Sequence, residues 1–472
     1  MVRLKARSES NGFTIPQRVH LIGAGGMHMS AIGQILLARG HIVTGSDIAA
    51  SEHVERLRAL GATIYEGHAA SNLGRAELVV TTVAARDDNP ELLAALSLGV
   101  PVLVRAEMVQ KLIADRDVLA VAGTHGKTTT TTLLAWMTVL GGLDPLVLAG
   151  GDSREIGSNA RDGAGRLAVV EADEYAEAFL QYEPRYALIL NVEADHLDYY
   201  GTEERFVEAF RAFSKRVQPE GTLFVSADSP YAAEIGAERA REGRRVERFA
   251  LGDSEAEWRA SQLRGNDRGG LDFLVQLDGA EVGRMSLQVP GRHNVSNALG
   301  ALAVAMRAGV DFHRAAQAAA EFTGAHRRFE RLAEVAGVTL MDDYAHHPTE
   351  VRATLQSARA RFPGRRLVAC FQPHTYSRSR YLLDGFRSCF ESLDRLYILG
   401  TYAARETSEA GLSAQELAAE IKKPAPTYVE TFEEAAERIA SELQPGDVFF
   451  TIGAGNVDAL GPMVRQLIEA RP

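Results

Sequence analysis

The residues with the clearest chemical potential form a glycine turn between an apolar run and a Thr-rich stretch. Residues 118–122 (VLAVA) lead directly into Gly123-Thr124-His125-Gly126-Lys127-Thr128-Thr129. The glycines let the backbone approach a polyphosphate, and the following helix points its free N–H groups and positive dipole end at the same place. Lys127 adds a charge for the β- and γ-phosphates, and the Thr128 hydroxyl suits Mg²⁺. The segment predicts a nucleotide-phosphate site.

This loop is shorter than the common G-x-x-x-x-G-K-[ST] pattern, because the residue five positions before Gly126 is Val121. The alternative interpretation is an ordinary β–α turn that contains a lysine. The apolar strand before the loop and the helix after it favour the phosphate site.

Two further apolar segments end in titratable residues. Residues 167–170 lead into Glu171-Ala-Asp-Glu, and residues 186–190 lead into Asn191-Val-Glu-Ala-Asp195-His196. Because the carboxyl ends of parallel strands meet at one edge of a sheet, we expect these side chains to converge on the phosphate loop. With Thr128 they would offer oxygen ligands to Mg²⁺. His196 is the exception, since imidazole suits softer ions, and a purely structural role stays open for it.

A second glycine turn lies near the start of the chain. Residues 18–22 lead into Gly23-Ala-Gly25-Gly26-Met27-His28-Met-Ser30, and a second predicted strand, residues 41–46, ends at Asp47. A strand, a glycine turn, a helix and an acid about 20 residues later fit a dinucleotide-binding unit. The sixth position of the G-x-G-x-x-G pattern is His28, however. A UDP-type diphosphate fits the turn as well as NAD does, and a turn without a ligand also stays open.

The third part of the chain carries another polar cluster. Residues 338–341 lead into Asp342-Asp343-Tyr-Ala-His346-His-Pro-Thr-Glu350, and residues 366–371 lead into Gln372-Pro-His-Thr375-Tyr-Ser-Arg378-Ser-Arg380. Arg378 and Arg380 suit a carboxylate or a phosphate. We expect a helix from Thr349. Before this part, residues 290–298 (PGRHNVSNA) open an Ala-rich helix, where Asn294 suits either a nucleotide base or an N-cap.

The order of strands and helices predicts three α/β domains, which we place at residues 1–114, 115–325 and 326–472. The charged residues 115–117 are the expected linker after the first domain. Further predicted strands are residues 62–65, 78–83 and 102–104 in the first domain and 396–399, 427–429 and 448–452 in the third. Residues 258–289 alternate apolar and polar side chains with glycine breaks, which predicts antiparallel β hairpins added to the second domain.

Bulk composition excludes several classes of protein. The formal net charge of −11 argues against a nucleic-acid partner. Cys370 and Cys389 form no C-x-x-C pair, so we expect neither a disulfide framework nor a zinc site, in keeping with a reducing cytoplasm. The charged residues 1–10 lead into no apolar segment, and no run of eighteen apolar residues follows. We therefore expect neither a signal peptide nor a membrane span.

In this order, the motifs resemble those of the Mur ligase family over nearly the whole chain from Val19. The glycine turn, Gly45-Ser-Asp47, residues 88–91 (DNPE) and residues 105–107 (RAE) are similar to the family's UDP-sugar domain. The phosphate loop, residues 171–174 (EADE), Asp195-His196 and residues 291–294 (GRHN) are similar to its central P-loop ATPase domain. Residues 342–350 (DDYAHHPTE) and 371–374 (FQPH) are similar to the amino-acid-binding domain of members that use L-alanine.

The resemblance implies a role for each group of residues. The expected UDP-sugar-binding residues are Gly23, Gly25, Gly26, Met27, His28, Ser30 and Asp47. The expected ATP-binding residues are Gly123, Thr124, His125, Gly126, Lys127, Thr128, Thr129, His293, Asn294, Asn297, Arg328 and Asp343. Among these, Lys127 would contact the phosphates, Asp343 the ribose, and the second-domain side chains His293, Asn294 and Asn297 the adenine. Thr128, Glu171 and His196 would surround Mg²⁺, and Lys127, His346 and Arg378 are the expected catalytic residues.

The resemblance also implies the reaction, in which ATP and Mg²⁺ support the joining of L-alanine to UDP-N-acetylmuramate in peptidoglycan precursor synthesis. The sugar carboxylate attacks the γ-phosphorus, and the amine of L-alanine then displaces phosphate from the acyl phosphate. No protein nucleophile is needed, which suits a chain without a G-x-S-x-G motif. His346 and Arg378 would hold L-alanine, with His346 as the candidate base. We expect no nucleic-acid or membrane partner, and a monomer or a homodimer.

Three residues depart from the family pattern. His28 stands where many members have glycine, Thr375 where many have arginine, and Asn456 where aspartate is usual. Thr375 leaves Arg378, with or without Arg380, to bind the substrate carboxylate.

Three other functions compete with the expected one. A peptide-recycling ligase would add a preformed peptide to the same UDP-sugar. A P-loop ATPase switch protein would share the phosphate loop but would not need the first glycine turn or the third-domain cluster. An NAD-dependent dehydrogenase would use the first glycine turn but would have no use for the phosphate loop at Lys127.

Overall fold

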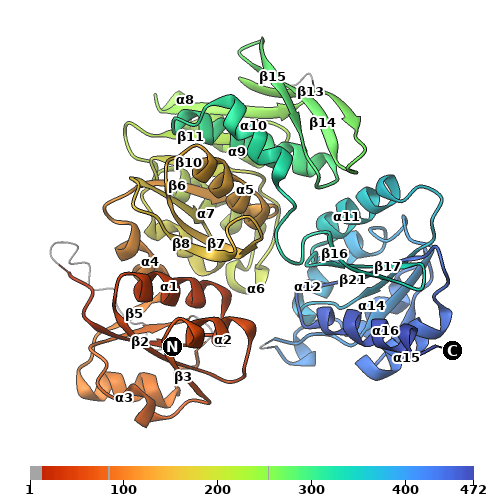
Figure 1. The fold of residues 1–472 in the computed structure, drawn as a ribbon, viewed down its shortest axis with the longest axis horizontal. Coiled ribbons are helices and arrows are strands. Elements are labelled where there is room, and N and C mark those ends of the chain that lie inside the picture. The colour runs from red at the N-terminus through yellow and green to blue at the C-terminus, as the bar shows by residue number, and fades with distance from the viewer. Residues whose placement is uncertain (1–12, 83–84, 253–254, 405, 472) are drawn as a thin grey trace.

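A computed structural model of the chain describes residues 13–82, 85–252, 255–404 and 406–471. Three sheets follow one another along the chain, and helices cover them in three separate lobes (Figure 1). The expected three-domain α/β architecture is confirmed. Residues 1–10, and Val83 at the end of one predicted strand, lie outside the described residues. No helix in the described part of the chain is long and apolar enough to span a membrane.

The first sheet is entirely parallel, in the order β3-β2-β1-β4-β5. Its order reverses between β1 and β4, the position where open α/β sheets bind ligands. The glycine turn follows β1 and so lies at this position. The strands are β1 (Arg18–Ile22), β2 (Ile42–Asp47), β3 (Thr63–Glu66), β4 (Leu78–Thr81) and β5 (Val102–Val104), with helices α1 (Met27–Ala38), α2 (Glu52–Ala59), α3 (Pro90–Leu98) and α4 (Arg105–Ile113).

The second sheet has ten strands in the order β15-β14-β13-β12-β11-β10-β6-β9-β7-β8. Strand β6, in the interior of this sheet, leads into the phosphate loop, and its two neighbours, β10 and β9, run parallel to it. The carboxyl ends of these three strands therefore lie together, as predicted from the sequence. The strands are β6 (Asp117–Ala122), β7 (Leu146–Ser153), β8 (Ser158–Asp162), β9 (Leu167–Glu171), β10 (Tyr186–Ile189), β11 (Thr222–Ser226), β12 (Arg245–Leu251), β13 (Trp258–Gly265), β14 (Leu271–Leu277) and β15 (Ala280–Ser286).

The predicted antiparallel hairpins are confirmed as β13, β14 and β15. They form no separate layer, because β13 pairs in parallel with β12 and continues the central sheet to the edge seen at the top of Figure 1. Strands β7, β8, β11 and β12 were not predicted from the sequence. The helices of this domain are α5 (Lys127–Leu140), α6 (Leu197–Tyr200), α7 (Glu203–Ser214), α8 (Pro230–Arg241), α9 (Arg292–Arg307) and α10 (Phe312–Glu321).

Helices α5 and α9 share one apolar core with the second sheet. Leu134 and Met137 of α5 belong to the same buried cluster as Ala298, Leu302 and Ala305 of α9. The small alanines let α9 lie close to the sheet and to α5. Gly126 at the N-cap of α5 lies against Asn297 near the beginning of α9, so both helix N-termini lie on the same side of the sheet.

The third sheet has the order β16-β17-β21-β18-β19-β20 and is parallel except for the edge strand β16. Helix α11 begins at Pro348, one residue before the predicted start, because the His347 side chain caps it by accepting the Thr349 N–H at 3.2 Å. The strands are β16 (Glu330–Val335), β17 (Val338–Asp343), β18 (Leu367–Phe371), β19 (Arg395–Leu399), β20 (Thr427–Val429) and β21 (Val448–Ile452), with helices α11 (Pro348–Arg361), α12 (Tyr376–Tyr381), α13 (Leu383–Phe386), α14 (Ala414–Glu420), α15 (Phe432–Glu442) and α16 (Leu460–Glu469).

Candidate active site

A cavity of about 480 Å³ lies where the three domains meet. Every domain contributes to its wall, and many of the lining residues lie at the carboxyl ends of strands or at the beginnings of the helices that follow them. The first domain supplies Met27 and His28, the second supplies Lys127, Thr128, Glu171, Glu174, Asp195 and His196, and the third supplies Tyr344, His346, His374 and Arg378. The cavity therefore joins the phosphate loop to the predicted amino-acid site.

The phosphate loop has the compact shape that its glycines allow. Gly126 adopts a φ of +82° at the N-cap of α5, and a Cβ added there would lie 2.6 Å from Oδ1 of Asn297. The amine of Lys127 donates to the carbonyls of Gly123 at 2.6 Å and Thr124 at 3.0 Å, and to Glu174 at 2.9 Å. Burial alone would lower the pKa of Lys127, but the carboxylate of Glu174 raises it above its usual value. The lysine is therefore charged.

The oxygen donors beside the loop fit a hard cation such as Mg²⁺. The Thr128 hydroxyl donates to Oε1 of Glu171 at 3.2 Å, and Oε2 of Glu171 accepts the Gly150 N–H at 2.8 Å. His196 lies near Glu174, the carboxylate that pairs with Lys127. Its Nε2 is 3.6 Å from Oε1 of Glu174. All three predicted ligands thus face one cavity, and their role as a metal set stays a prediction.

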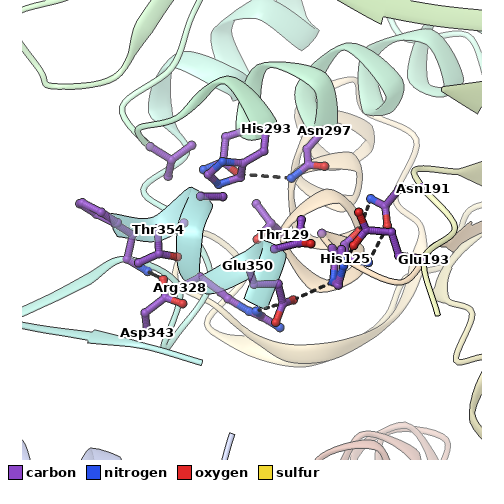
Figure 2. A pocket seen from close by; sticks show the side chains of 17 residues that line it. His125, Thr129, Asn191, Glu193, His293, Asn297, Arg328, Asp343, Glu350 and Thr354 are labelled. Carbon is purple, nitrogen blue, oxygen red and sulfur yellow. Dashed lines mark hydrogen bonds and ion pairs between the residues drawn. The ribbon is translucent and has the colours of Figure 1, made fainter. Parts of the chain in front are cut away.

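A second cavity, of about 200 Å³, lies between the second and third domains. In Figure 2, His293 and Asn297 project into it from α9, while Glu350 and Thr354 project from α11. Besides His293 and Asn297, the predicted ATP-binding side chains that line it are His125, Thr129, Asn294, Arg328 and Asp343. The structure therefore brings the expected adenine and ribose residues together, next to the phosphate loop.

Two side chains in this second cavity have well-defined partners. Asn294 is not the N-cap of α9, which is Gly291; instead its Nδ2 donates to the Pro290 carbonyl at 2.7 Å. The Asp343 carboxylate accepts the backbone N–H groups of Phe329 and Ala345, both at 2.8 Å. Burial raises the pKa of Asp343 to about 6.

His125 lies between two carboxylates at the edge of this cavity. Its Nε2 is 2.8 Å from Oε2 of Glu193, and its Nδ1 is 3.4 Å from Oε1 of Glu350. Burial opposes protonation, but the two carboxylates outweigh it and raise the pKa of His125 to about 9. The phosphate loop thus carries an imidazolium as well as the charge of Lys127.

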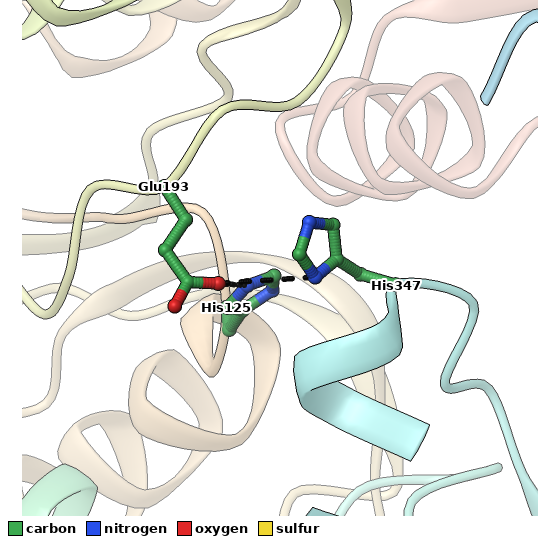
Figure 3. A group of neighbouring side chains, drawn as sticks. All are labelled: His125, Glu193 and His347. Atoms are coloured by element: carbon green, nitrogen blue, oxygen red, sulfur yellow. Dashed lines mark hydrogen bonds and ion pairs between the residues drawn. The ribbon is translucent and has the colours of Figure 1, made fainter. Parts of the chain in front are cut away.

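Figure 3 shows that His125, Glu193 and His347 approach one another closely enough to be considered as metal ligands. Two observations argue against that use. The carboxylates of Glu193 and Glu350 stabilise the protonated form of His125, and Nδ1 of His347 accepts the Thr349 N–H that begins α11. A metal ligand must offer a free lone pair, which His125 lacks in this state.

His346 has its tautomer fixed by the backbone. Nδ1 lies 3.1 Å from the carbonyl oxygen of Tyr344, and because a carbonyl only accepts, Nδ1 carries the proton. Burial lowers the pKa of His346 to about 3, so the ring is neutral with its lone pair on Nε2. The neutral ring can accept a proton or a hydrogen bond at Nε2, and its low pKa makes it a weaker base than an ordinary imidazole.

Arg378 is buried in the same part of the cavity, whereas Arg380 is not. Arg380 is exposed and donates to the Gly411 carbonyl at 3.4 Å, so it does not join Arg378. Thr375 is the N-cap of α12, and Asn456 accepts a hydrogen bond from Gln372 at 2.9 Å. Of the two arginines considered, only Arg378 faces the cavity.

The predicted UDP-sugar residues fall into two groups. Met27 and His28 line the three-domain cavity. Gly23, Gly25, Gly26, Ser30 and Asp47 make up or border the turn itself, in which the Gly25 N–H donates to Oδ2 of Asp47 at 2.8 Å. Burial, followed by the nearby Arg105, lowers the pKa of His28, so a neutral imidazole stands at this position of the turn.

Three models of known families match the chain. The model for the Mur ligase family, catalytic domain, matches residues 18–117, that for the Mur ligase middle domain matches residues 121–305, and that for the Mur ligase, glutamate ligase domain, matches residues 327–455. The chain belongs to the Mur ligase family. The first and third sheets lie within their matched ranges, and the second sheet does so except for the first residues of β6, 117–120.

Curated relatives of this Mur ligase are named UDP-N-acetylmuramate–L-alanine ligase. The protein from Solidesulfovibrio magneticus is 42% identical over 451 residues, which cover 94% of this chain and 97% of the relative. The protein from Geobacter sulfurreducens is 40% identical over 460 residues, which cover 96% and 98%.

Solved structures give the same architecture. The crystal structure of UDP-N-acetylmuramate-alanine ligase from Thermotoga maritima superposes with a TM-score of 0.80 at 28% identity and covers 95% of this chain and 98% of that one. A murein peptide ligase from Psychrobacter arcticus gives a TM-score of 0.75 at 24% identity, covering 97% and 100%, and shows the fold alone.

Several residues of the Mur ligase site were given no individual role from the sequence, beyond the expectation that the acids after β9 and β10 offer oxygens to Mg²⁺. They are Asp173, Glu174, Glu193, Asp195, Glu350 and His374. Most of them bind a partner from another segment, as Asp173 binds Arg105 of the first domain at 2.7 Å. The sequence shows many titratable residues at the ends of strands, and this indicates a site. It does not show which of these side chains pair with each other.

Proposed function

We propose that this Mur ligase joins L-alanine to UDP-N-acetylmuramate with ATP, through an acyl phosphate, and so contributes to peptidoglycan precursor synthesis. The observation that carries the proposal is a single cavity in which the phosphate loop faces a neutral histidine and a buried arginine. The names of relatives at 40–42% identity over nearly the whole chain support the same reaction.

Each domain would hold one substrate, with the domains taken as residues 1–114, 115–325 and 326–472. The first would bind the UDP-sugar at its glycine turn and present the lactyl carboxylate near Met27 and His28. The second would bind ATP, with Lys127 and the imidazolium of His125 neutralising phosphate charge. The third would bind L-alanine.

The groups around Lys127 support a phosphoryl-transfer role for this part of the cavity. Thr128, Glu171 and His196 would hold Mg²⁺, which neutralises charge on the phosphate oxygens when it is bound. Lys127 is held by Glu174 and two loop carbonyls, so its charge is fixed in place before any substrate arrives. Fixed charge of this kind costs no reorganisation in the transition state.

The third-domain residues support the second step, in which the amine attacks the acyl carbon. Nε2 of His346 carries a lone pair that can take the proton released by the amine, and Arg378 would bind the carboxylate of the amino acid. The C–N bond forms as the C–O bond to phosphate breaks, and the electron pair leaves with the phosphate. No side chain becomes covalently modified.

Competition between acceptors is the decisive test. The enzyme receives ATP, Mg²⁺ and UDP-N-acetylmuramate, with either L-alanine or the tripeptide of the cell wall, and phosphate release is measured together with the amide product. We expect L-alanine to give one amide per phosphate. Preference for the tripeptide would establish the peptide-recycling ligase, and phosphate release without any amino acid would establish an ATPase switch.

A further inference from the structure

Asp195 and Arg378 form a buried ion pair between two domains. Asp195 follows β10 in the second domain, and Arg378 lies on α12 in the third. Nε and Nη2 of Arg378 donate to Oδ1 of Asp195 at 3.1 and 2.8 Å. Arg378 is only 8% exposed and Asp195 only 6%, so solvent screens the pair very little.

Arg378 also fixes the tautomer of His374. Its Nη1 donates to Nδ1 of His374 at 2.9 Å and lies 3.4 Å from the His374 carbonyl. A guanidinium has no acceptor, so Nδ1 of His374 must be the acceptor and its proton must lie on Nε2. Burial lowers the pKa of His374 to about 4, which keeps the ring neutral.

The two histidines of the cavity consequently hold opposite tautomers. The rings of His346 and His374 are 5.9 Å apart, and both residues line the three-domain cavity. His346 offers a lone pair on Nε2, because the Tyr344 carbonyl takes its Nδ1 proton. His374 offers an N–H on Nε2, because Arg378 occupies its Nδ1.

We propose that Asp195 is a positioning residue for the amino-acid half of the site, which orients Arg378 across the domain boundary and through it keeps His374 as an N–H donor. This rests on the proposed function, in which Arg378 binds the carboxylate of L-alanine. A guanidinium has five N–H groups, and the contacts with Asp195 and His374 account for at most two each. One N–H on Nη2 is left for a substrate oxygen.

The amino-acid half of the site is built from residues of two domains. Asp195 belongs to the second domain, whereas the two residues that it positions belong to the third. The amino-acid half of the site is therefore complete only when these domains are in contact. Conditions that bring them together strengthen L-alanine binding without any change in the residues that touch it.

The test compares Asp195→Asn with Asp198→Asn in the full-length enzyme. Both variants lose one negative charge at positions three residues apart, but Asp198 is exposed and acts on Arg378 only through space, whereas Asp195 is buried and hydrogen-bonded to it. For Asp195→Asn we expect KM for L-alanine to rise by about tenfold or more, the effect of weakening a charge-assisted hydrogen bond. KM for ATP and the Mg²⁺ concentration at half-maximal rate should stay within about twofold of the wild type, and Asp198→Asn should match the wild type in all three.

Asp195→Glu and a double-mutant cycle with Arg378→Lys complete the test. Asp195→Glu keeps the charge and should recover part of the affinity for L-alanine. In the cycle, the effects of Asp195→Asn and Arg378→Lys should be strongly non-additive, because the two residues act as a unit. The cycle is measured on enzyme whose melting temperature shows that it is folded.

Three results would overturn the proposal. A lower KM for L-alanine in Asp195→Asn would mean that Asp195 competes with the substrate for Arg378. A change confined to ATP or Mg²⁺ would mean that Asp195 acts through His196, whose backbone N–H it accepts at 2.7 Å. Additive effects in the cycle would show no coupling. Failure of the wild type to use L-alanine is a separate result, which would reject the proposed function.

Discussion

His125 of the phosphate loop and Glu350 of α11 face each other across the boundary between the second and third domains, with Nδ1 and Oε1 3.4 Å apart. Glu193 holds the opposite side of the same imidazole at 2.8 Å. The third domain therefore contacts the nucleotide loop through a charged group. The loop that would bind ATP also helps to hold the two domains together.

This contact makes stability depend on pH. The pKa of His125 is about 9 in the folded chain and about 6.5 when unfolded, so its contribution is complete below pH 6.5 and is lost as the pH rises through 9. The difference corresponds to roughly 3 kcal/mol. We expect the free energy of unfolding to fall by about that amount between pH 6.5 and 9.5 in the wild type, measured by denaturant titration, and to fall much less in His125→Gln. An equal fall in both proteins would show that other groups cause it.

Lys127 should be required for phosphoryl transfer but not for binding the UDP-sugar. We expect Lys127→Ala to lower the rate of ATP-dependent amide formation by about 100-fold or more, because it removes a fixed positive charge from the phosphate site. Lys127→Gln, which can still donate to Glu174, serves where the alanine variant does not fold. Affinity for UDP-N-acetylmuramate, measured by calorimetry, should change by less than about twofold.

Lys215→Ala is the matched control for this prediction, because Lys215 is an exposed lysine at the C-cap of α7, a different helix of the same domain. It should leave the rate unchanged. Full turnover by either Lys127 variant would reject the assigned role of the loop.

The parts of the site that follow from local sequence were predictable. The phosphate loop and the acids within residues 171–174 and 193–195 all follow or end apolar strands, and parallel pairing brings such strand ends together. The hairpins β13 to β15 were also predictable from their alternation. Their attachment to β12 was not, because edge pairing depends on the whole sheet.

The parts that depend on contacts between distant segments were not predictable. The pairs His125–Glu350 and Asp195–Arg378 each join residues of two domains, and no spacing in the sequence encodes them. The exclusion of Arg380 from the site has a similar origin. It lies two residues after Arg378 on α12, and positions i and i+2 of a helix do not face the same way.

Arg105 should contribute to stability through a buried pair with Asp173. Nη2 of Arg105 and Oδ2 of Asp173 are 2.7 Å apart, and the two side chains are 10% and 23% exposed. Arg105→Met leaves the partly buried carboxylate of Asp173 without its arginine partner, which costs about 2–3 kcal/mol, below the penalty for a fully buried pair. We expect a correspondingly lower free energy of unfolding in a urea titration.

The exposed pair of Arg58 and Glu55 in the same domain provides the comparison, since its side chains are 37% and 61% exposed. Arg58→Met should cost no more than about 1 kcal/mol. Similar losses for the two variants would mean that burial does not determine the strength of the Arg105 pair.

His346 should act in amide formation and not in the activation of the sugar carboxylate. Its neutral ring keeps a lone pair on Nε2, and with a pKa of about 3 it does not titrate in the pH range where the enzyme is assayed. We expect His346→Gln to slow amide formation by roughly 10²- to 10⁴-fold, the usual effect of losing a general base. Acyl phosphate, trapped by reduction with borohydride in the absence of L-alanine, should form at nearly the wild-type rate. The wild-type pH profile should show no inflection from His346 above pH 5. If both steps slow equally in the variant, His346 supports the site as a whole and is not the base.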